Sequence, residues 1–197
     1  MKFTQLPADT FKQLQINAGI ICSDFTPNTG TVVASSILGA TSGGINVSAV
    51  PTFADMGDDV DNCPKNTKEL KKVTSWEVKA SGSFVTMTAA LAKSLVGAGS
   101  VDGTTKIVPS MALDSGVSGD FADLWFVGDY SDKNGATNGG FIAVRIMNAL
   151  STGGFVIQTS DQEKGKFAFE YSGHTSISSP ETVPYEIYVS AGSAEPT

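Results

Sequence analysis

A single histidine, His174, limits the acid–base chemistry open to this chain of 197 residues. A Ser-His-Asp site would have to use His174, but no G-x-S-x-G turn for a nucleophilic serine occurs anywhere in the sequence. One histidine and two cysteines are also too few for the usual zinc ligand sets. We therefore predict no catalytic residue, no metal and no cofactor, and we expect the protein not to be an enzyme.

Clustered aspartates are the second candidate for chemistry, because carboxylates are the ligands of Ca²⁺. The cluster consists of Asp55, Asp58, Asp59 and Asp61. A calcium loop starting at Asp58 would place Glu69 correctly at its twelfth position, but Val60 falls at the third and Cys63 at the sixth, where glycine is required. A register that begins at Tyr130 also fails, since Phe141 then takes the twelfth position. The cluster is better interpreted as an acidic loop, with an adventitious cation left open.

Three further motifs are assigned no function. Cys22 and Cys63 have no C-x-x-C spacing, and we expect both to be free thiols. The glycine-rich segment 97–103 has one residue too many before its last glycine to match a phosphate-binding turn. It also follows an expected helix, whereas phosphate-binding turns follow a strand. The glycosylation sequon at 46–48 is interpreted as chance, because no signal peptide precedes it.

Composition indicates a protein that packs against other protein. Charged residues make up only 17% of the chain, against roughly 25% in ordinary soluble proteins. The net charge of −7 has the wrong sign for gripping phosphate, although a negative wall suits a channel through which DNA must slide. No segment has the length of a signal peptide or membrane span, so we expect a protein that is cytosolic when made.

One domain over 1–190 is expected, with an all-β-dominated fold: a β-sandwich or partly closed barrel with one flanking α-helix. The helix is predicted over 86–96, where Met87, Ala90, Leu91 and Leu95 form an apolar stripe that ends at Gly97. Residues 7–14 predict a helical turn in an N-terminal arm, and 191–197 a flexible C-terminal tail.

Strands are predicted from alternation of apolar and polar residues and from flanking turn residues. The segment 75–84 is the clearest, because Trp76, Val78, Ala80 and Phe84 share one face. In 45–53, Phe53 is predicted on the half-buried face of Ile45, Val47 and Ala49. The predicted strands are 16–25, 30–38, 45–53, 75–84, 121–130, 141–150, 155–160, 167–173 and 183–189.

The segment 55–72 is predicted to be a long polar loop with its charges separated. Four aspartates are followed by four lysines, and Glu69 is the only acidic residue among the lysines. Loops of this length in a compact domain are usually functional, and separated charges can meet a complementary patch on a neighbour. We therefore predict a subunit interface here, against the alternative of a solvated surface loop. Its residues are Asp55, Asp58, Asp59, Asp61, Lys65, Lys68, Lys71 and Lys72.

Several segments, taken in order, resemble one protein family. Residues 17–27 (Asn-Ala-Gly-Ile-Ile-Cys-Ser-Asp-Phe-Thr-Pro) resemble the opening strand of the major tail tube proteins of long-tailed bacteriophages and related prophages. The strongest likeness begins at residues 123–132 (Asp-Leu-Trp-Phe-Val-Gly-Asp-Tyr-Ser-Asp) and continues through 139–143 to 148–155. Each motif alone is weak, but their number and order are specific. Further matching segments are 53–67, 75–77 with 82–86, 165–174 and 182–188.

The resemblance implies a β-sandwich subunit that forms hexameric rings, contributes strands to a continuous inner barrel and stacks into a hollow tube for dsDNA. It implies tape measure, tail terminator and distal tail proteins as partners. The place implied is the virion tail, assembled in the cytoplasm of the bacterial host. We expect the hairpin 123–150, or the pair 45–84, to face a lumen that is negative or neutral.

Two alternatives stay open at this point. A carbohydrate-binding or adhesin-like β-sandwich would also have short strands and aromatic residues such as Trp76 and Trp125, although aromatic residues on strands mostly belong to the core. A related subunit could also build the tube of a contractile tail or of a phage-derived bacteriocin particle. The likeness favours the flexible, non-contractile tail.

Overall fold

The computed structural model describes residues 15, 17–116, 119–130 and 140–191. These residues are mostly β-strand with one α-helix, which confirms the predicted all-β-dominated fold class. The predicted arm turn at 7–14 and the tail residues 192–197 lie outside the described residues. The elements are β1 (Ile20–Cys22), β2 (Phe25–Thr26), β3 (Thr31–Val32), β4 (Thr41–Asp55), β5 (Lys71–Phe84), α1 (Ala89–Val96), β6 (Gly99–Asp102), β7 (Lys106–Pro109), β8 (Ala122–Tyr130), β9 (Gly140–Ser151), β10 (Val156–Gln158), β11 (Lys166–Ser172) and β12 (Tyr185–Ser190).

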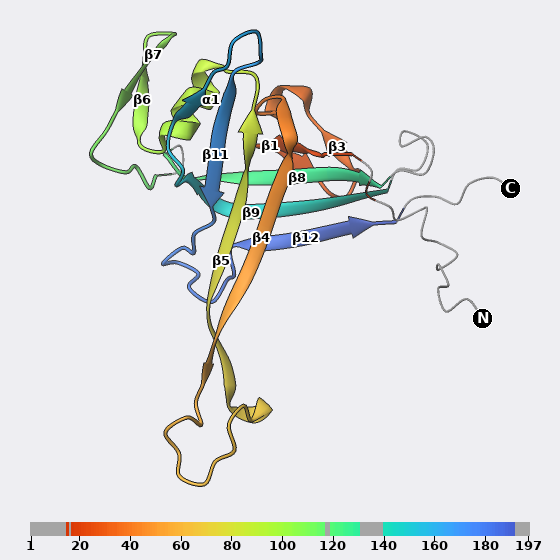
Figure 1. Cartoon of the computed structure of the whole chain (residues 1–197), viewed down its shortest axis with the longest axis vertical. Helices are drawn as coiled ribbons and strands as arrows, with labels where there is room; N and C mark the ends of the chain where they lie inside the picture. The colour runs from red at the N-terminus through yellow and green to blue at the C-terminus, as the bar shows by residue number, and fades with distance from the viewer. Residues whose placement is uncertain (1–14, 16, 117–118, 131–139, 192–197) are drawn as a thin grey trace, which may run out of the picture.

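Eight of the strands form one antiparallel sheet that is folded into two halves (Figure 1). We call the half made of β1, β8, β9 and β12 the β8–β9 sheet, and the half made of β10, β11, β5 and β4 the β4–β5 sheet. Strand β9 belongs to the first half and reaches β11 of the second through the pair Ser151–Tyr171. It bends at Asn148, whose φ of +47° lies in the left-handed region that asparagine tolerates. Such a bend lets the two halves cross and pack face to face.

The main core lies between these halves. Alternate residues of β5, β11, β8 and β9 point into it, and α1 closes one end with Leu91 and Leu95. A second apolar cluster covers the opposite face of the β8–β9 sheet, where Phe25 packs edge-on against Trp125 and Phe141. The β8–β9 sheet therefore carries an apolar cluster on each face, although Ile187 and Val189 of β12 stay exposed, whereas the outer face of the β4–β5 sheet is open.

Helix α1 confirms the predicted helix at 86–96, with a start three residues later. The Thr88 hydroxyl accepts a hydrogen bond from the Leu91 amide at 3.1 Å, so Thr88 caps the first turn. Gly97 ends the helix with φ +82°. The Ser151 hydroxyl donates to the Leu95 carbonyl at 2.9 Å, which ties the helix end to β9.

The predicted strand at 30–38 is largely wrong. Only Thr31–Val32 is extended, and Ala34–Ser36 forms a 3₁₀ turn because the Ser36 amide donates to the Val33 carbonyl. The predicted strand at 16–25 is likewise shortened to β1 and β2. This part of the chain wraps over one face of the β8–β9 sheet, where local turns suit it better than a continuous ladder.

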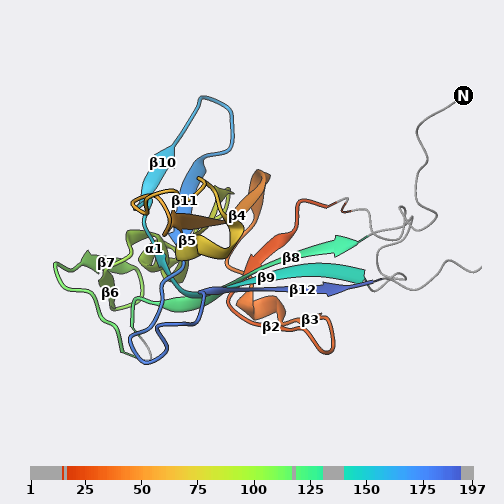
Figure 2. The ribbon, with the colours of Figure 1, turned by 90° about the horizontal axis from the view of Figure 1, so that it is seen from below.

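The most conspicuous feature is the hairpin of β4 and β5, with 15 and 14 residues in its strands. Strand β11 pairs with β5 only over Lys79–Phe84. From Val78 towards the loop that joins them, β4 and β5 pair only with each other. Figure 1 shows this part projecting from the body, and Figure 2 shows it end-on, between β8, β9 and β12 on one side and α1, β6 and β7 on the other. The predicted loop 55–72 is shorter than expected, because the strands continue to Asp55 and from Lys71.

Candidate subunit interface

An apolar stripe runs out of the core along one face of the hairpin. Inside the body, Ala49 opposes Val78, and the Trp76 ring packs against Tyr185 with 5.3 Å between centroids. The next apolar pair outward is Phe53 and Val73, whose side chains are 56% and 42% exposed. They are only partly covered: Val73 borders a cleft of about 420 Å³ whose other wall is formed by Thr175 and residues 180–184.

A β-bulge keeps this stripe continuous. Thr52 pairs with Ser75 and Phe53 with Val73, so Thr74 is the extra residue on β5. The extra residue moves Val73 onto the face that carries Phe53. The sequence predicted the face of Phe53 correctly but not its exposure, since alternation cannot show that the hairpin continues past the opposing sheet.

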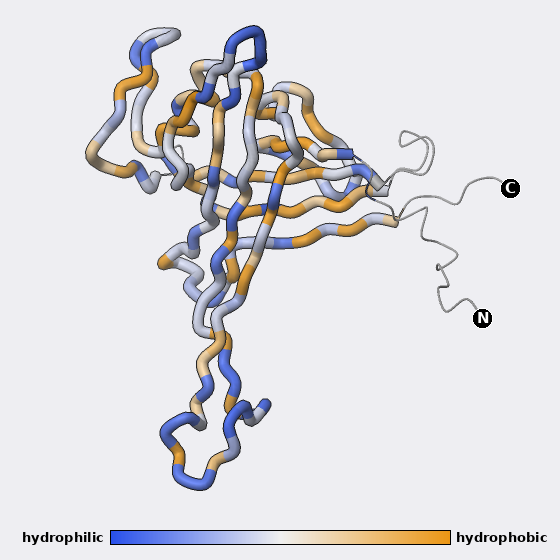
Figure 3. Tube along the Cα trace, viewed as in Figure 1, coloured by the Kyte–Doolittle hydropathy of each residue, from blue (hydrophilic) through white to orange (hydrophobic). Residues whose placement is uncertain are grey.

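We call residues 50–75 the distal hairpin. Its outer part adds further exposed apolar side chains at Met56 and Val60. Figure 3 shows hydrophobic residues interspersed with hydrophilic ones along this segment. Scattered apolar side chains are normal on a surface, but apolar side chains that adjoin the core on a projecting two-stranded hairpin make this segment a candidate protein-binding surface.

Two of the eight predicted interface residues shape the loop at the end of the hairpin. The Asp55 carboxylate accepts hydrogen bonds from the amides of Gly57 at 3.1 Å and Asn66 at 2.9 Å. The Lys71 ammonium donates to the Asn66 side-chain oxygen at 2.7 Å. Asp55 and Lys71 also oppose each other in the final pair of the ladder. These contacts hold a loop in which Asn62 and Asn66 adopt positive φ.

The other six predicted residues point their charges outward. Their side chains are exposed, and within residues 55–72, all of which the structure describes, none of the aspartates forms a salt bridge with a lysine. Lys68 instead lies 3.4 Å from the neighbouring Glu69. These charges thus remain free to meet a partner, and their assignment to an interface stays a prediction. The six are Asp58, Asp59, Asp61, Lys65, Lys68 and Lys72.

The open face of the β4–β5 sheet carries mostly polar side chains, together with the exposed Val50 and Val156. Ser81 lies between Asn46 and Glu170 in neighbouring strands, and Ser83 opposes Ala168. Lys79 lies 2.6 Å from Glu77 and 3.9 Å from Glu170, and its hydrogen bond to Glu77 raises the pKa of its ammonium group. With Lys166 on the same face of β11, the two carboxylates are balanced by two lysines, so this face is close to neutral.

A charged network secures β12 to β9. Arg145 donates to Asp123 at 2.6 Å and to Glu186 at 3.2 Å, and these hydrogen bonds, Asp123 first, raise the pKa of its guanidinium. The Tyr188 hydroxyl donates to Glu186 at 2.7 Å, which raises the pKa of Tyr188. The guanidinium also lies 5.7 Å from the centroid of the Trp125 ring.

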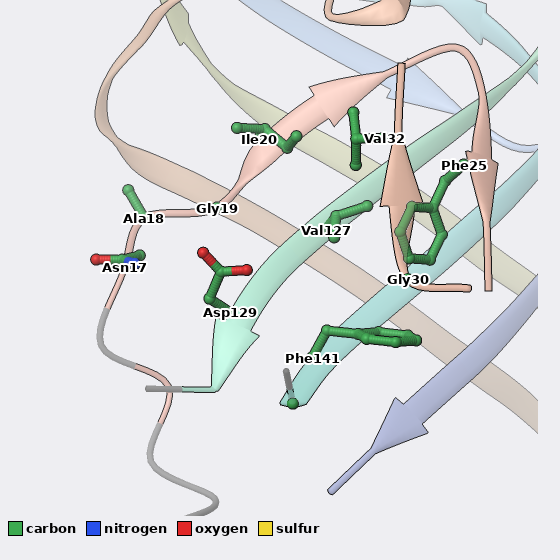
Figure 4. Close-up of a pocket in the computed structure, with 11 residues that line it drawn as sticks. Asn17, Ala18, Gly19, Ile20, Phe25, Gly30, Val32, Val127, Asp129 and Phe141 are labelled. Atoms are coloured by element: carbon green, nitrogen blue, oxygen red, sulfur yellow. The ribbon is translucent and has the colours of Figure 1, made fainter. Parts of the chain in front are cut away.

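A cleft of about 430 Å³ opens beside β1 and the ends of β8 and β9 (Figure 4). Phe25, Val127 and Phe141 form its apolar wall, and Asp129 is the one charged residue that lines it. Among the described residues that line the cleft, no serine, cysteine, histidine or lysine accompanies this carboxylate. His174 lies elsewhere, with Nδ1 3.2 Å from the Asn148 carbonyl oxygen and its ring edge-on to Phe121.

Cys22 is buried, and burial raises the pKa of its thiol to about 11, whereas Cys63 is partly buried; both are free. In the described ranges, no three His, Cys, Asp or Glu side chains are grouped so as to hold a metal ion. No helix in the same ranges is long and apolar enough to cross a bilayer.

Comparison with known proteins adds no assignment, because no protein-family model and no curated protein matches the chain. The class that the fold defines is an all-β protein with one flanking helix. Its candidate functional surface is the distal hairpin.

Proposed function

We propose that this protein is the structural subunit of a bacteriophage tail tube, which assembles into stacked hexameric rings around a conduit for dsDNA. The observation that carries this proposal is the apolar stripe that leaves the core through Trp76 and continues to Phe53 and Val73 on the distal hairpin. A subunit that works only in an assembly needs such a surface, and a monomer does not.

The energetic argument starts from the hairpin itself. A two-stranded hairpin is at best marginally stable in water, and its strands need a third neighbour or a packed face. Covering Phe53 and Val73 on a second copy removes apolar surface from water at roughly 25 cal/mol per Å². The outward charges of the tip, such as Asp58 and Lys68, would orient that contact, since exposed pairs contribute only about 0.2 to 1 kcal/mol each.

The face that suits the lumen is the open face of the β4–β5 sheet. Of the two segments considered from the sequence, 45–84 is favoured over 123–150, because apolar clusters pack on both faces of β8 and β9. Serines such as Ser81 and Ser83 and the balanced charges around Lys79 would give DNA no cationic wall to adhere to.

The remaining parts of the proposal rest on the resemblance. Tape measure, tail terminator and distal tail proteins would be the partners at the ends and inside of the tube. The place of function would be the virion tail, after synthesis and assembly in the host cytoplasm. The tube of a contractile tail or of a bacteriocin particle would use the same surfaces.

The glycan-binding alternative is not favoured by the tryptophans on which it depended. Trp125 is buried beneath Phe25 and Arg145, and Trp76 is partly buried against Tyr185, so neither offers an exposed platform for a sugar ring. The exposed large apolar residues on the distal hairpin are aliphatic apart from Phe53.

Sedimentation velocity over a range of concentrations, with negative-stain microscopy of the same samples, tests the proposal. We expect rings or tubes to appear as concentration rises. A protein that sediments as a monomer throughout, and shows no tubes, would rule out the tail-tube role.

A further inference from the structure

Strands β8, β9 and β12 continue past the place where β4 crosses them (Figure 1). A groove of about 570 Å³ opens there, between one face of these strands and the edge strand β4. Phe126, Ile142 and Ile187 line the groove from the β8–β9 sheet, and Ile45 and Val47 line it from β4. None of the described residues that line it is charged.

The apolar surface of the groove extends along β12. Ile187 pairs with Val144 and Val189 with Ile142, so the side chains of all four residues share one face of the sheet. In the part of the chain that the structure describes, Ile187 is 57% and Val189 62% exposed. An uncharged groove that continues into exposed apolar side chains is suited to an apolar occupant.

The chain itself leads into this groove. Gly19 adopts φ +75°, which glycine accepts readily, and turns the chain away from the pairing of β1 with β8. The Gln15 side chain then lies directly over Gly128 of β8, where the backbone carries no Cβ to block it. Gln15 also lines the groove. Residues 1–14, which lie outside the described residues, are therefore joined directly to the groove.

The composition of residues 1–14 fits an apolar groove. The large apolar residues of this segment are Met1, Phe3, Leu6, Phe11 and Leu14. The other undescribed segments that adjoin β8, β9 and β12, 131–139 and 192–197, contain no Val, Leu, Ile, Met or aromatic residue. A helix of this length would span about 20 Å, and an extended chain more, whereas three adjacent strands span only about 10 Å. Residues 1–14 can thus reach across all three strands.

We propose that residues 1–14 dock in this groove of their own chain, with Phe11 and Leu14 against the apolar face of β8, β9 and β12. Residues three apart share one face of a helical turn, which is the conformation that the sequence predicts for 7–14. Docking removes apolar surface of both the segment and the groove from water. The occupant is part of the same chain, so this inference does not depend on the protein forming a tube.

A double-mutant cycle in the full chain tests the docking. The segment variant is Phe11→Ser with Leu14→Ser, and the groove variant is Ile187→Ser. We expect each to lower the urea midpoint of unfolding by at least about 0.5 M, because each removes the same apolar contact. The combined variant should lose clearly less than the sum, since the second change removes a contact that is already lost. Additive losses, or no loss from the segment variant, would overturn the proposal.

Matched controls change positions away from the contact. Thr10→Ser with Gln13→Ser keeps every large apolar residue of the segment and should shift the midpoint by less than about 0.2 M. Ile157→Ser on β10 replaces an isoleucine that is 54% exposed and should cost less than half as much as Ile187→Ser. Circular dichroism shows whether each variant folds. Leu14→Ala and Ile187→Ala repeat the cycle with smaller changes if a serine variant does not fold.

Trypsin distinguishes docking within one chain from docking on a second copy. A docked segment protects the bond after Lys12, so cleavage there should be about fivefold faster in Ile187→Ser than in wild type, at every protein concentration. Protection that disappears on dilution would place the segment on a second copy and overturn the proposal. Equal cleavage rates in wild type and Ile187→Ser would overturn it as well.

Discussion

Phe53 and Val73 oppose each other across β4 and β5, one step beyond Trp76, and both remain exposed. The bulge at Thr74 is what puts them on one face. This pair defines where the core of the subunit ends and where, in our proposal, the core of an assembly begins.

Replacing both residues, as Phe53→Ser with Val73→Ser, should leave the subunit folded but unable to assemble. Because Phe53 and Val73 are 56% and 42% exposed, we expect the free energy of unfolding to fall by no more than about 1 kcal/mol. Urea unfolding and sedimentation velocity measure the two effects. Val101→Ser on β6, exposed to a similar degree, is the control. Assembly of the double variant at wild-type concentrations would show that the stripe is not an interface.

Charge reversal in the tip should also stop polymerisation. Lys68, Lys71 and Lys72 changed together to glutamate should give a folded subunit that forms no tubes, and wild-type assembly should weaken as salt screens the exposed charges. Because Lys71 also bonds to Asn66, a variant with only Lys68→Glu and Lys72→Glu separates charge from loop shape. Normal tubes from the triple variant, at low and high salt alike, would show that the charges of the loop have no role in assembly.

Asp120 should contribute a pH-dependent share of stability. Its carboxylate accepts a hydrogen bond from the Asp114 amide at 2.9 Å and lies 3.5 Å from the Lys93 ammonium, with its side chain only 4% exposed. The hydrogen bond from Asp114 is the main cause that lowers the pKa of Asp120, with Gly99 and Lys93 adding to it. A lowered pKa means that the contribution is complete above the ordinary carboxyl value, near 3.9, and is lost as pH falls through the folded value.

The corresponding variant is Asp120→Ala, which leaves the Asp114 amide without its partner. We expect a loss of about 1 to 3 kcal/mol at pH 7, and a smaller difference from wild type in strong acid. Urea unfolding at several pH values measures both, and Asp102→Ala on the exposed β6–β7 turn is the control. An equal difference from wild type at every pH would contradict the assignment.

Much of the fold follows from local patterns. Alternation from Trp76 to Phe84 predicted β5, and the apolar stripe with Gly97 predicted α1 and its end, although the start was placed three residues early. The predicted strand over 30–38 was largely wrong because its β-branched residues favour strands, yet Val33 is exposed at a turn. Strand propensity describes a fit to a pleated surface, and only the fold decides whether that surface is present.

The candidate interface was only partly visible in the sequence. The charges of 55–72 drew attention to the hairpin that also carries the exposed Phe53 and Val73. Asp55 itself accepts hydrogen bonds from Gly57 and Asn66 of its own loop. The exposure of Phe53 could not be foreseen, because it depends on where the opposing sheet stops. The groove beside β4 depends likewise on how the two halves cross, which alternation does not encode.

The neutral face of the β4–β5 sheet predicts a lumen that does not hold DNA. Ser81→Lys with Ser83→Lys should assemble into tubes that bind dsDNA in a salt-dependent way, whereas wild-type tubes should not bind it. Fluorescence anisotropy with labelled duplex, in low salt, measures the difference. Equal binding by both tubes, or none by either, would place this face away from the lumen.

Cryo-electron microscopy of the assembled wild-type protein tests the central claim most directly. We predict stacked six-membered rings in which Phe53 and Val73 of each distal hairpin are buried against a neighbouring copy, with the serine face of the β4–β5 sheet around the bore. A reconstruction in which the distal hairpin projects freely into solvent, or a protein that remains monomeric on the grid, would contradict the account.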